Sequence, residues 1–135
     1  MKYLGVDYGT KRIGLAVSDD DGSMAFPYLV LDNRGVIHAA DDIIMACSNK
    51  DAGAVVIGQS IDYALQDNPI MKHIYKLEEY IKEKSKLEIY YEDERLSSLE
   101  AERIQGKNEK LDASAATIIL NSFLEKRKNS PEVRP

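Results

Sequence analysis

Three groups of acidic residues stand out because each falls where a predicted strand or helix meets a turn. Asp7 ends an apolar segment and precedes a glycine-containing turn, and Asp93 and Glu94 follow another apolar segment. Asp112 stands at the start of the last predicted helix. Carboxylates that gather at one end of a domain repel each other, and desolvation raises their pKa values unless a cation neutralises them. The pattern therefore predicts a metal site.

The chemistry of such a site depends on the ion that it holds. Carboxylate oxygens alone suit hard divalent cations, so Mg²⁺ or Mn²⁺ is the expected cofactor. Two such ions about 4 Å apart can activate a water molecule and stabilise the leaving oxygen of a phosphodiester. We therefore expect hydrolysis of a nucleic-acid backbone, with nucleic acid as the partner.

Each acidic group also has an interpretation that involves no catalysis. Asp7 could accept backbone hydrogen bonds within its own turn, as Asx residues often do. The run Glu92–Glu94 could be a charged segment that faces solvent. Asp112 could cap the helix that follows it. The residues by themselves leave these alternatives open.

Short apolar segments separated by turn residues predict a mixed α/β domain. Three strands come first, over Lys2–Val6, Ile13–Ser18 and Pro27–Leu31. Helices and strands then alternate: a helix over Val36–Ser48, a strand over Ala54–Gly58, a helix from Asn68 onward, a strand over Leu87–Tyr91, and helices over Ser97–Gln105 and Ala113–Lys126. This order predicts a mixed five-stranded sheet flanked by helices, with three antiparallel strands first and parallel crossovers afterwards. Ligands bind at the carboxyl edge of such sheets, where Asp7 is expected.

The helix after Asn68 has the clearest predicted start. Asn68 can cap it, and Pro69 is tolerated in a first helical turn. Its apolar stripe is expected to bury Ile70, Ile74, Leu77 and Ile81.

The composition is that of one globular domain. A chain of 135 residues with 44% hydrophobic residues can build one core of ordinary size. We expect this domain over residues 1–126 and a flexible charged tail over 127–135. No apolar run approaches the roughly 18 residues that span a bilayer, so we expect a cytoplasmic protein with no membrane partner.

The cysteine and histidine content argues against a zinc site. Cys47 is the only cysteine and lies in an apolar helical stretch, where a buried thiol is expected. His38 and His73 have no cysteine neighbours at zinc-ligand spacing. The formal net charge of −5 argues against a non-specific nucleic-acid coat but is compatible with a nuclease that carries carboxylates at its centre.

The segments around the acidic residues resemble the YqgF family, also called RuvX, of Holliday-junction resolvases. The resemblance spans almost the whole chain and rests on Leu4–Ser18, Asp93–Ser98, Glu100–Arg103, Asp112–Ala116, Ile119, Leu120 and Ser122.

Membership of that family would imply a ribonuclease H-like fold and a metal-dependent endonuclease. The substrate would be the 5′ end of precursor 16S ribosomal RNA, branched DNA, or both. The acidic triad of the family would map to Asp7, Glu94 and Asp112, with Asp93 as the other candidate ligand of the adjacent pair. The basic residues that would hold phosphates or neutralise charge in the transition state are Lys11, Arg12, Arg95 and Arg103.

Two segments depart from the family pattern. Gly58–Ala64 replaces the expected Gly-Leu-Pro-like turn and polar loop, and Gly106–Leu111 is shorter and less basic than expected. Both would border the substrate channel, which keeps a second hypothesis open: a non-catalytic module that binds nucleic acid or regulates another protein.

The turn after Asp7 also resembles the first phosphate loop of sugar kinases, actin and Hsp70-type ATPases. Those proteins close two such domains around a nucleotide, and this chain has room for one. Resolution of a four-way junction would require two active sites and therefore a homodimer, whereas trimming of an RNA would require one.

Overall fold

A five-stranded sheet forms the centre of the protein in the computed structural model, which describes residues 1–59, 69–93 and 111–128. The strands are β1 (Lys2–Tyr8), β2 (Arg12–Ser18), β3 (Ala25–Asp32), β4 (Ala52–Gln59) and β5 (Glu88–Asp93). Their order in the sheet is β3-β2-β1-β4-β5. β2 is antiparallel to both β1 and β3, whereas β4 is parallel to both β1 and β5. The predicted mixed sheet is therefore confirmed.

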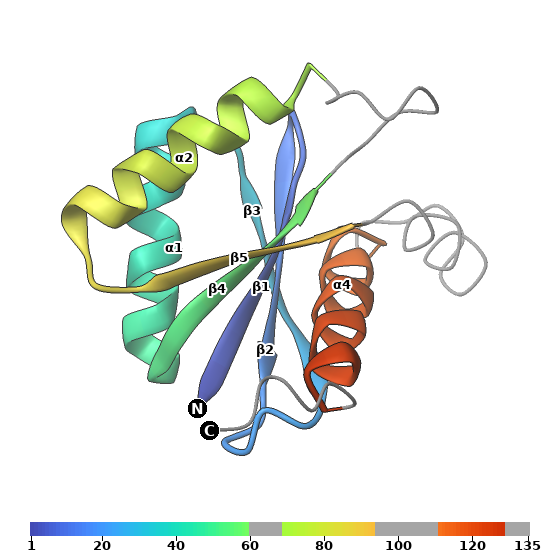
Figure 1. Cartoon of the computed structure of the whole chain (residues 1–135). Coiled ribbons are helices and arrows are strands. Elements are labelled where there is room, and N and C mark those ends of the chain that lie inside the picture. Colours follow the sequence, from blue (N-terminus) through green and yellow to red (C-terminus); the bar gives the residue numbers. More distant parts are fainter. Residues whose placement is uncertain (60–68, 94–110, 129–135) are drawn as a thin grey trace.

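Helices cover both faces of this sheet (Figure 1). α1 (Val36–Lys50) and α2 (Met71–Lys84) lie on one face, and α4 (Leu111–Lys128) lies on the other. None of the helices in the described part of the chain is long and apolar enough to cross a membrane. Cys47 of α1 is buried, as predicted.

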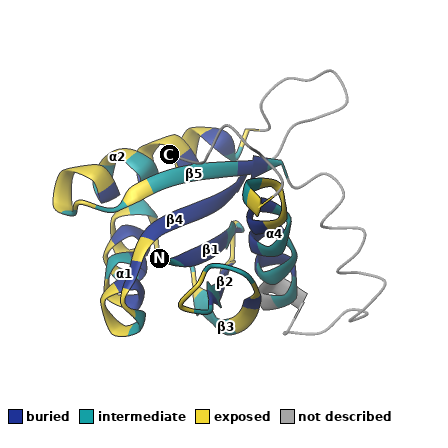
Figure 2. Cartoon of the chain, turned by 60° about the horizontal axis from the view of Figure 1, so that its bottom comes forward, coloured by how far each residue is buried: buried dark blue, intermediate teal, exposed yellow. Residues whose placement is uncertain are grey.

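Alternation of side chains along β1 builds the two layers of the core. Leu4, Val6 and Tyr8 belong to the cluster under α1 and α2, whereas Tyr3 belongs to the cluster under α4. A strand buried on both faces has apolar residues at successive positions rather than alternating ones, which is the pattern of β1 and β4. Figure 2 shows these two strands buried along most of their length between the helix layers.

The sheet and α4 approach each other very closely at Gly5. A Cβ atom on Gly5 would lie 2.9 Å from Leu120 Cβ and 3.0 Å from the carbonyl oxygen of Ala116. Further along the helix, the ring of Phe123 lies 5.6 Å from that of Tyr3, measured between centroids. Residue numbers therefore rise along α4 as they fall along β1. The helix runs antiparallel to the strand, and its first turn lies toward the carboxyl end of β1.

The predicted start of the second helix was wrong. α2 begins at Met71 and has no side-chain cap, and Pro69 stands in the preceding turn, where its carbonyl accepts a hydrogen bond from the amide of Lys72. Asn68 lies outside the described residues. Ile70 is only partly buried because it precedes the first helical turn and lines a pocket. The buried stripe consists of Met71, Ile74, Leu77 and Ile81.

The other elements begin or end within a few residues of their predicted positions. β5 extends to Asp93 because that residue still pairs with Gln59 of β4. α4 begins at Leu111 and continues to Lys128. Its last turn is anchored by the Arg127 guanidinium, which lies over the rings of Tyr3, Tyr90 and Phe123. The predicted helix over Ser97–Gln105 and residues 129–135 lie outside the described residues.

Candidate active site

Asp7 lies at the carboxyl end of β1, as the sequence predicted. It is the second-to-last residue of the strand and is partly buried. Tyr3 and Gly5 face α4, so alternation places Asp7 on the same face of the sheet. The carboxylate is thus held by a buried central strand, which limits its movement.

Asp112 is the second residue of α4, within its first turn. It precedes Ala116 by one helical turn, a rise of about 6 Å. Asp7 follows Gly5 by two residues, about 6.6 Å along the strand. Because Gly5 packs against Ala116 and the two elements are antiparallel, the first turn of α4, with Asp112, lies toward the end of β1 that carries Asp7. The described helix already includes Leu111, so Asp112 is not its N-cap residue.

The structure separates Asp93 from Asp7 across the sheet. Asp93 is the last residue of β5 rather than the first residue after it. The hydroxyl of Tyr91 donates a 2.6 Å hydrogen bond to Glu78 of α2, and burial together with this bond raises the pKa of Tyr91. Alternation places Asp93 on the same face as Tyr91, opposite to Asp7. Glu94 lies outside the described residues.

Glu92 is a buried carboxylate that the sequence analysis treated only as part of a charge run. It is 5% exposed, accepts a 2.7 Å hydrogen bond from Ser122 Oγ and forms a 2.7 Å ion pair with Lys126 Nζ, and both partners are on α4. Glu92 therefore ties the end of β5 to the helix that carries Asp112. The spacing Glu88–Tyr90–Glu92 was the available signal, because it places Glu92 on the same face as Tyr90, which packs against the core under α4.

The turn after Asp7 carries two of the predicted basic residues. Lys11 and Arg12 are both exposed there. The Gly9 amide donates to the Arg12 carbonyl at 2.9 Å, and the Asn33 amide donates to the Lys11 carbonyl at 2.9 Å. These bonds fix the turn against the end of β3. Arg95, Arg103 and residues 60–68 lie outside the described residues.

The described residues include only part of the predicted metal-ligand set. No group of three or more candidate ligand side chains lies together within them. Asp7 stands near the end of β1 and Asp112 in the first turn of α4, and the third predicted ligand, Glu94, follows β5 directly in the sequence. This donor set consists of oxygen atoms and fits Mg²⁺ or Mn²⁺ better than a softer ion.

Curated relatives of this chain match it along most of its length. The family model of RuvX, described as Holliday junction resolvase, matches residues 1–126. A protein of Nitratidesulfovibrio vulgaris that is named for a pre-16S rRNA nuclease is 38% identical, and the match covers 99% of this chain and 97% of that protein. A relative of the same name from Maridesulfovibrio salexigens is 34% identical, with 92% and 98% covered.

Solved structures of resolvases share the fold. Thermus thermophilus RuvC, in a structure with a Holliday junction substrate, superposes with a TM-score of 0.62 at 15% identity, and 96% of each chain is covered. The fowlpox virus resolvase, in complex with Holliday junction DNA, gives a TM-score of 0.60 at 12% identity, with 93% of this chain and 98% of that chain covered. The predicted ribonuclease H-like fold is confirmed. Together with the match over residues 1–126, these comparisons show that the chain belongs to the RuvX family of Holliday junction resolvases.

Proposed function

We propose that this protein is a metal-dependent endonuclease whose active site lies at the carboxyl edge of the sheet, between β1 and the first turn of α4. The observation that carries the proposal is the close packing of Gly5 against Ala116. Asp7 follows Gly5 by two residues in β1, and Asp112 precedes Ala116 by four residues in α4. Two carboxylates brought to this edge would repel each other unless a cation lay between them. The arrangement of β1 and α4 therefore favours a metal site over a structural turn.

Asp7, Glu94 and Asp112 are the residues that would hold the metal. Bound Mg²⁺ or Mn²⁺ would supply an activated water molecule and charge stabilisation for the leaving oxygen. Glu94 is preferred over Asp93 because Asp93 ends β5 on the opposite face of the sheet. Glu92 would hold the end of β5 against α4 and thereby keep the metal ligands at a fixed separation.

Basic residues would position the nucleic-acid backbone around this centre. Lys11 and Arg12 are exposed on the turn that directly follows Asp7. Their charges would neutralise phosphates next to the scissile bond, and we assign the same role to Arg95 and Arg103. The overall charge of −5 makes such a local basic rim necessary, because the rest of the surface repels polyanions.

The substrate that we propose is structured RNA at the 5′ end of precursor 16S rRNA, with branched DNA as the other candidate. The relatives are named for the first substrate, and the family for the second. Trimming of precursor rRNA would take place in the cytoplasm and needs one active site. Symmetric resolution of a junction needs two active sites and therefore a homodimer.

The test is cleavage of both labelled substrates by the wild-type protein. Each substrate is incubated with Mg²⁺, with Mn²⁺ and with chelator, and products are resolved by length. We expect cuts that require metal, and the substrate cut faster identifies the physiological class. Binding of either substrate without cleavage at any metal concentration would reject the nuclease and support the non-catalytic module.

A further inference from the structure

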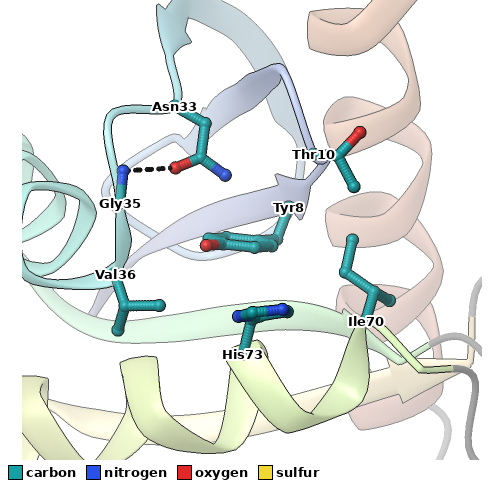
Figure 3. Close-up of a pocket in the computed structure, with 7 residues that line it drawn as sticks. All are labelled: Tyr8, Thr10, Asn33, Gly35, Val36, Ile70 and His73. Carbon is teal, nitrogen blue, oxygen red and sulfur yellow. Dashed lines mark hydrogen bonds between the residues drawn. The ribbon is translucent and has the colours of Figure 1, made fainter.

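A pocket opens at the same edge of the sheet, on the face opposite to Asp7. It has a volume of about 270 Å³ and lies between the end of β1 and the starts of α1 and α2. Figure 3 shows the side chains that line it, which are Tyr8, Thr10, Asn33, Gly35, Val36, Ile70 and His73. Tyr8 is the neighbour of Asp7 in β1, so the two side chains point to opposite faces of one strand.

The hydroxyl of Tyr8 marks this pocket as a binding site. Tyr8 is 8% exposed, and its ring belongs to the core cluster. Its hydroxyl points into the pocket, toward Gly35 and Val36, and makes no hydrogen bond with another described residue (Figure 3). None of the described residues has a buried side-chain oxygen or nitrogen without a hydrogen-bond partner, so this hydroxyl is open to the pocket rather than sealed in the core. A phenylalanine would fill the core equally well, whereas the hydroxyl can bond to a group that enters the pocket. A ligand that accepts a hydrogen bond would satisfy this group.

The start of α1 adds backbone donors to the same pocket. The N-cap position is Gly35, at φ 109°, a conformation that favours glycine, and the helix has neither a side-chain cap nor an acidic residue in its first turn. Ala39 is the first residue whose amide bonds back into the helix, to the carbonyl of Gly35. The amides of Val36 and Ile37 therefore point out of the helix start without intrahelical partners, as in helices that bind anions.

The one amide side chain among the described lining residues, that of Asn33, already has partners for both of its polar atoms. Asn33 Oδ1 accepts a 2.9 Å hydrogen bond from the Gly35 amide, and Asn33 Nδ2 donates a 2.8 Å hydrogen bond to the Gly9 carbonyl. Asn33 thus fixes the start of α1 beside the end of β1. Among the described lining residues, the groups that can still donate to a ligand are the hydroxyls of Tyr8 and Thr10, the first amides of α1 and the ring of His73, which faces Tyr8 (Figure 3). No carboxylate is among the described lining residues.

We propose that this pocket binds a phosphate group. A set of donors at a helix start, without any carboxylate among the described lining residues, complements an oxyanion, and the apolar walls of Val36 and Ile70 strengthen such hydrogen bonds by excluding water. The phosphate is that of a nucleic-acid strand that crosses the sheet edge from the Asp7 face to the Tyr8 face. That last step rests on the proposed nuclease function, whereas binding of phosphate itself does not.

The first experiment tests phosphate binding without any nucleic acid. Inorganic phosphate is titrated into ¹⁵N-labelled protein at constant ionic strength, with chloride as the reference anion, and amide chemical shifts are followed by NMR. We expect saturable shifts at Val36 and Ile37. Tyr8→Phe should weaken phosphate binding about tenfold, because one hydrogen bond to a charged group is lost. Tyr28→Phe, a matched substitution on β3 outside the pocket, should leave it unchanged.

The second experiment asks whether the phosphate belongs to the nucleic acid. Affinity for the RNA or junction is compared between Asp7→Asn and the double variant Asp7→Asn with Tyr8→Phe, so that cleavage does not interfere. We expect about tenfold weaker binding by the double variant. Equal affinities, with phosphate still bound in the first experiment, would show that the pocket takes a free phosphate and would overturn the substrate assignment. Absence of saturable shifts at Val36 and Ile37, or equal phosphate binding by Tyr8→Phe, would overturn the site itself even in a protein that cleaves.

Discussion

The carbonyl oxygen of Ala116 lies 3.0 Å from the position that a Cβ atom on Gly5 would occupy. This contact sets how closely α4, which carries Asp112, can approach β1, which carries Asp7. An added methyl group would have to displace helix backbone, which is not a flexible group. We predict that Gly5→Ala lowers the free energy of unfolding by about 1–3 kcal/mol and slows cleavage more than tenfold.

Gly53→Ala is the matched control for that substitution. It also adds a methyl group to a strand of the same sheet, but there the methyl would meet only the side chain of Met1, at 3.6 Å or more. Urea unfolding and cleavage rates of the two variants should therefore diverge. If Gly5→Ala behaved like Gly53→Ala in both measurements, the close approach would not control the site.

The adjacent acidic residues Asp93 and Glu94 should differ sharply in their effects. Asp93 ends β5 on the face of α2, and we assign the metal to Glu94. Glu94→Gln should reduce cleavage by more than about a hundredfold, because a metal ligand is lost. Asp93→Asn should retain most of the activity. Rates measured at saturating Mg²⁺ for both variants check this assignment, and the reverse order of effects would exchange the two roles.

The hydrogen bond between Ser122 and Glu92 should contribute more to the free energy of unfolding than a hydrogen bond on the surface does. Removal of the Ser122 hydroxyl leaves the buried Glu92 carboxylate with one partner fewer, so Ser122→Ala should cost about 1–3 kcal/mol. In a Glu92→Gln background the same substitution should cost less, because the acceptor is no longer charged. A double-mutant cycle by urea unfolding measures the coupling, and a coupling energy of zero would contradict this interpretation.

Cys47 should be chemically inert in the folded protein. Burial raises the pKa of its thiol from 9.0 to about 12. At pH 8 the reactive thiolate is then roughly a thousandfold rarer in the folded state than in the unfolded state. Iodoacetamide should modify Cys47 slowly until urea unfolds the protein, as followed by mass spectrometry. Rapid modification of the native protein would show that α1 opens readily.

The sequence predicted those parts of the fold that local patterns encode. The apolar runs of β1 and β4 and the helical stripe of α2 carry their own periodicity, so the mixed sheet could be anticipated. The position of Asp7 at a strand end followed from the glycine turn beside it. The start of α2 was missed, because Pro69 stands in the turn before Met71 rather than in the first helical turn that its local signal predicted.

The relations between distant residues could not be predicted in this way. The approach of α4 to β1, the elements that carry Asp112 and Asp7, depends on the packing of Gly5 against α4, which no local pattern encodes. Glu92 lies within an acidic run. The sequence alone could not show whether its carboxylate contacts Ser122 and Lys126 in the interior or faces solvent. The family resemblance supplied the acidic triad, and the pocket beside Tyr8 emerged only from the structure.

The most direct test of the proposed active site is the cleavage rate of Asp7→Asn compared with Asp20→Asn. The two substitutions are chemically identical, but Asp20 is exposed at the opposite end of β1, where its ion pair with Lys2 contributes little. With metal and substrate in excess, Asp7→Asn should lower the cleavage rate more than about a hundredfold. The same variant should keep the wild-type unfolding midpoint and nucleic-acid affinity. Asp20→Asn should cleave at the wild-type rate. Cleavage by Asp7→Asn at the wild-type rate would contradict the account, because the metal site would then lie elsewhere.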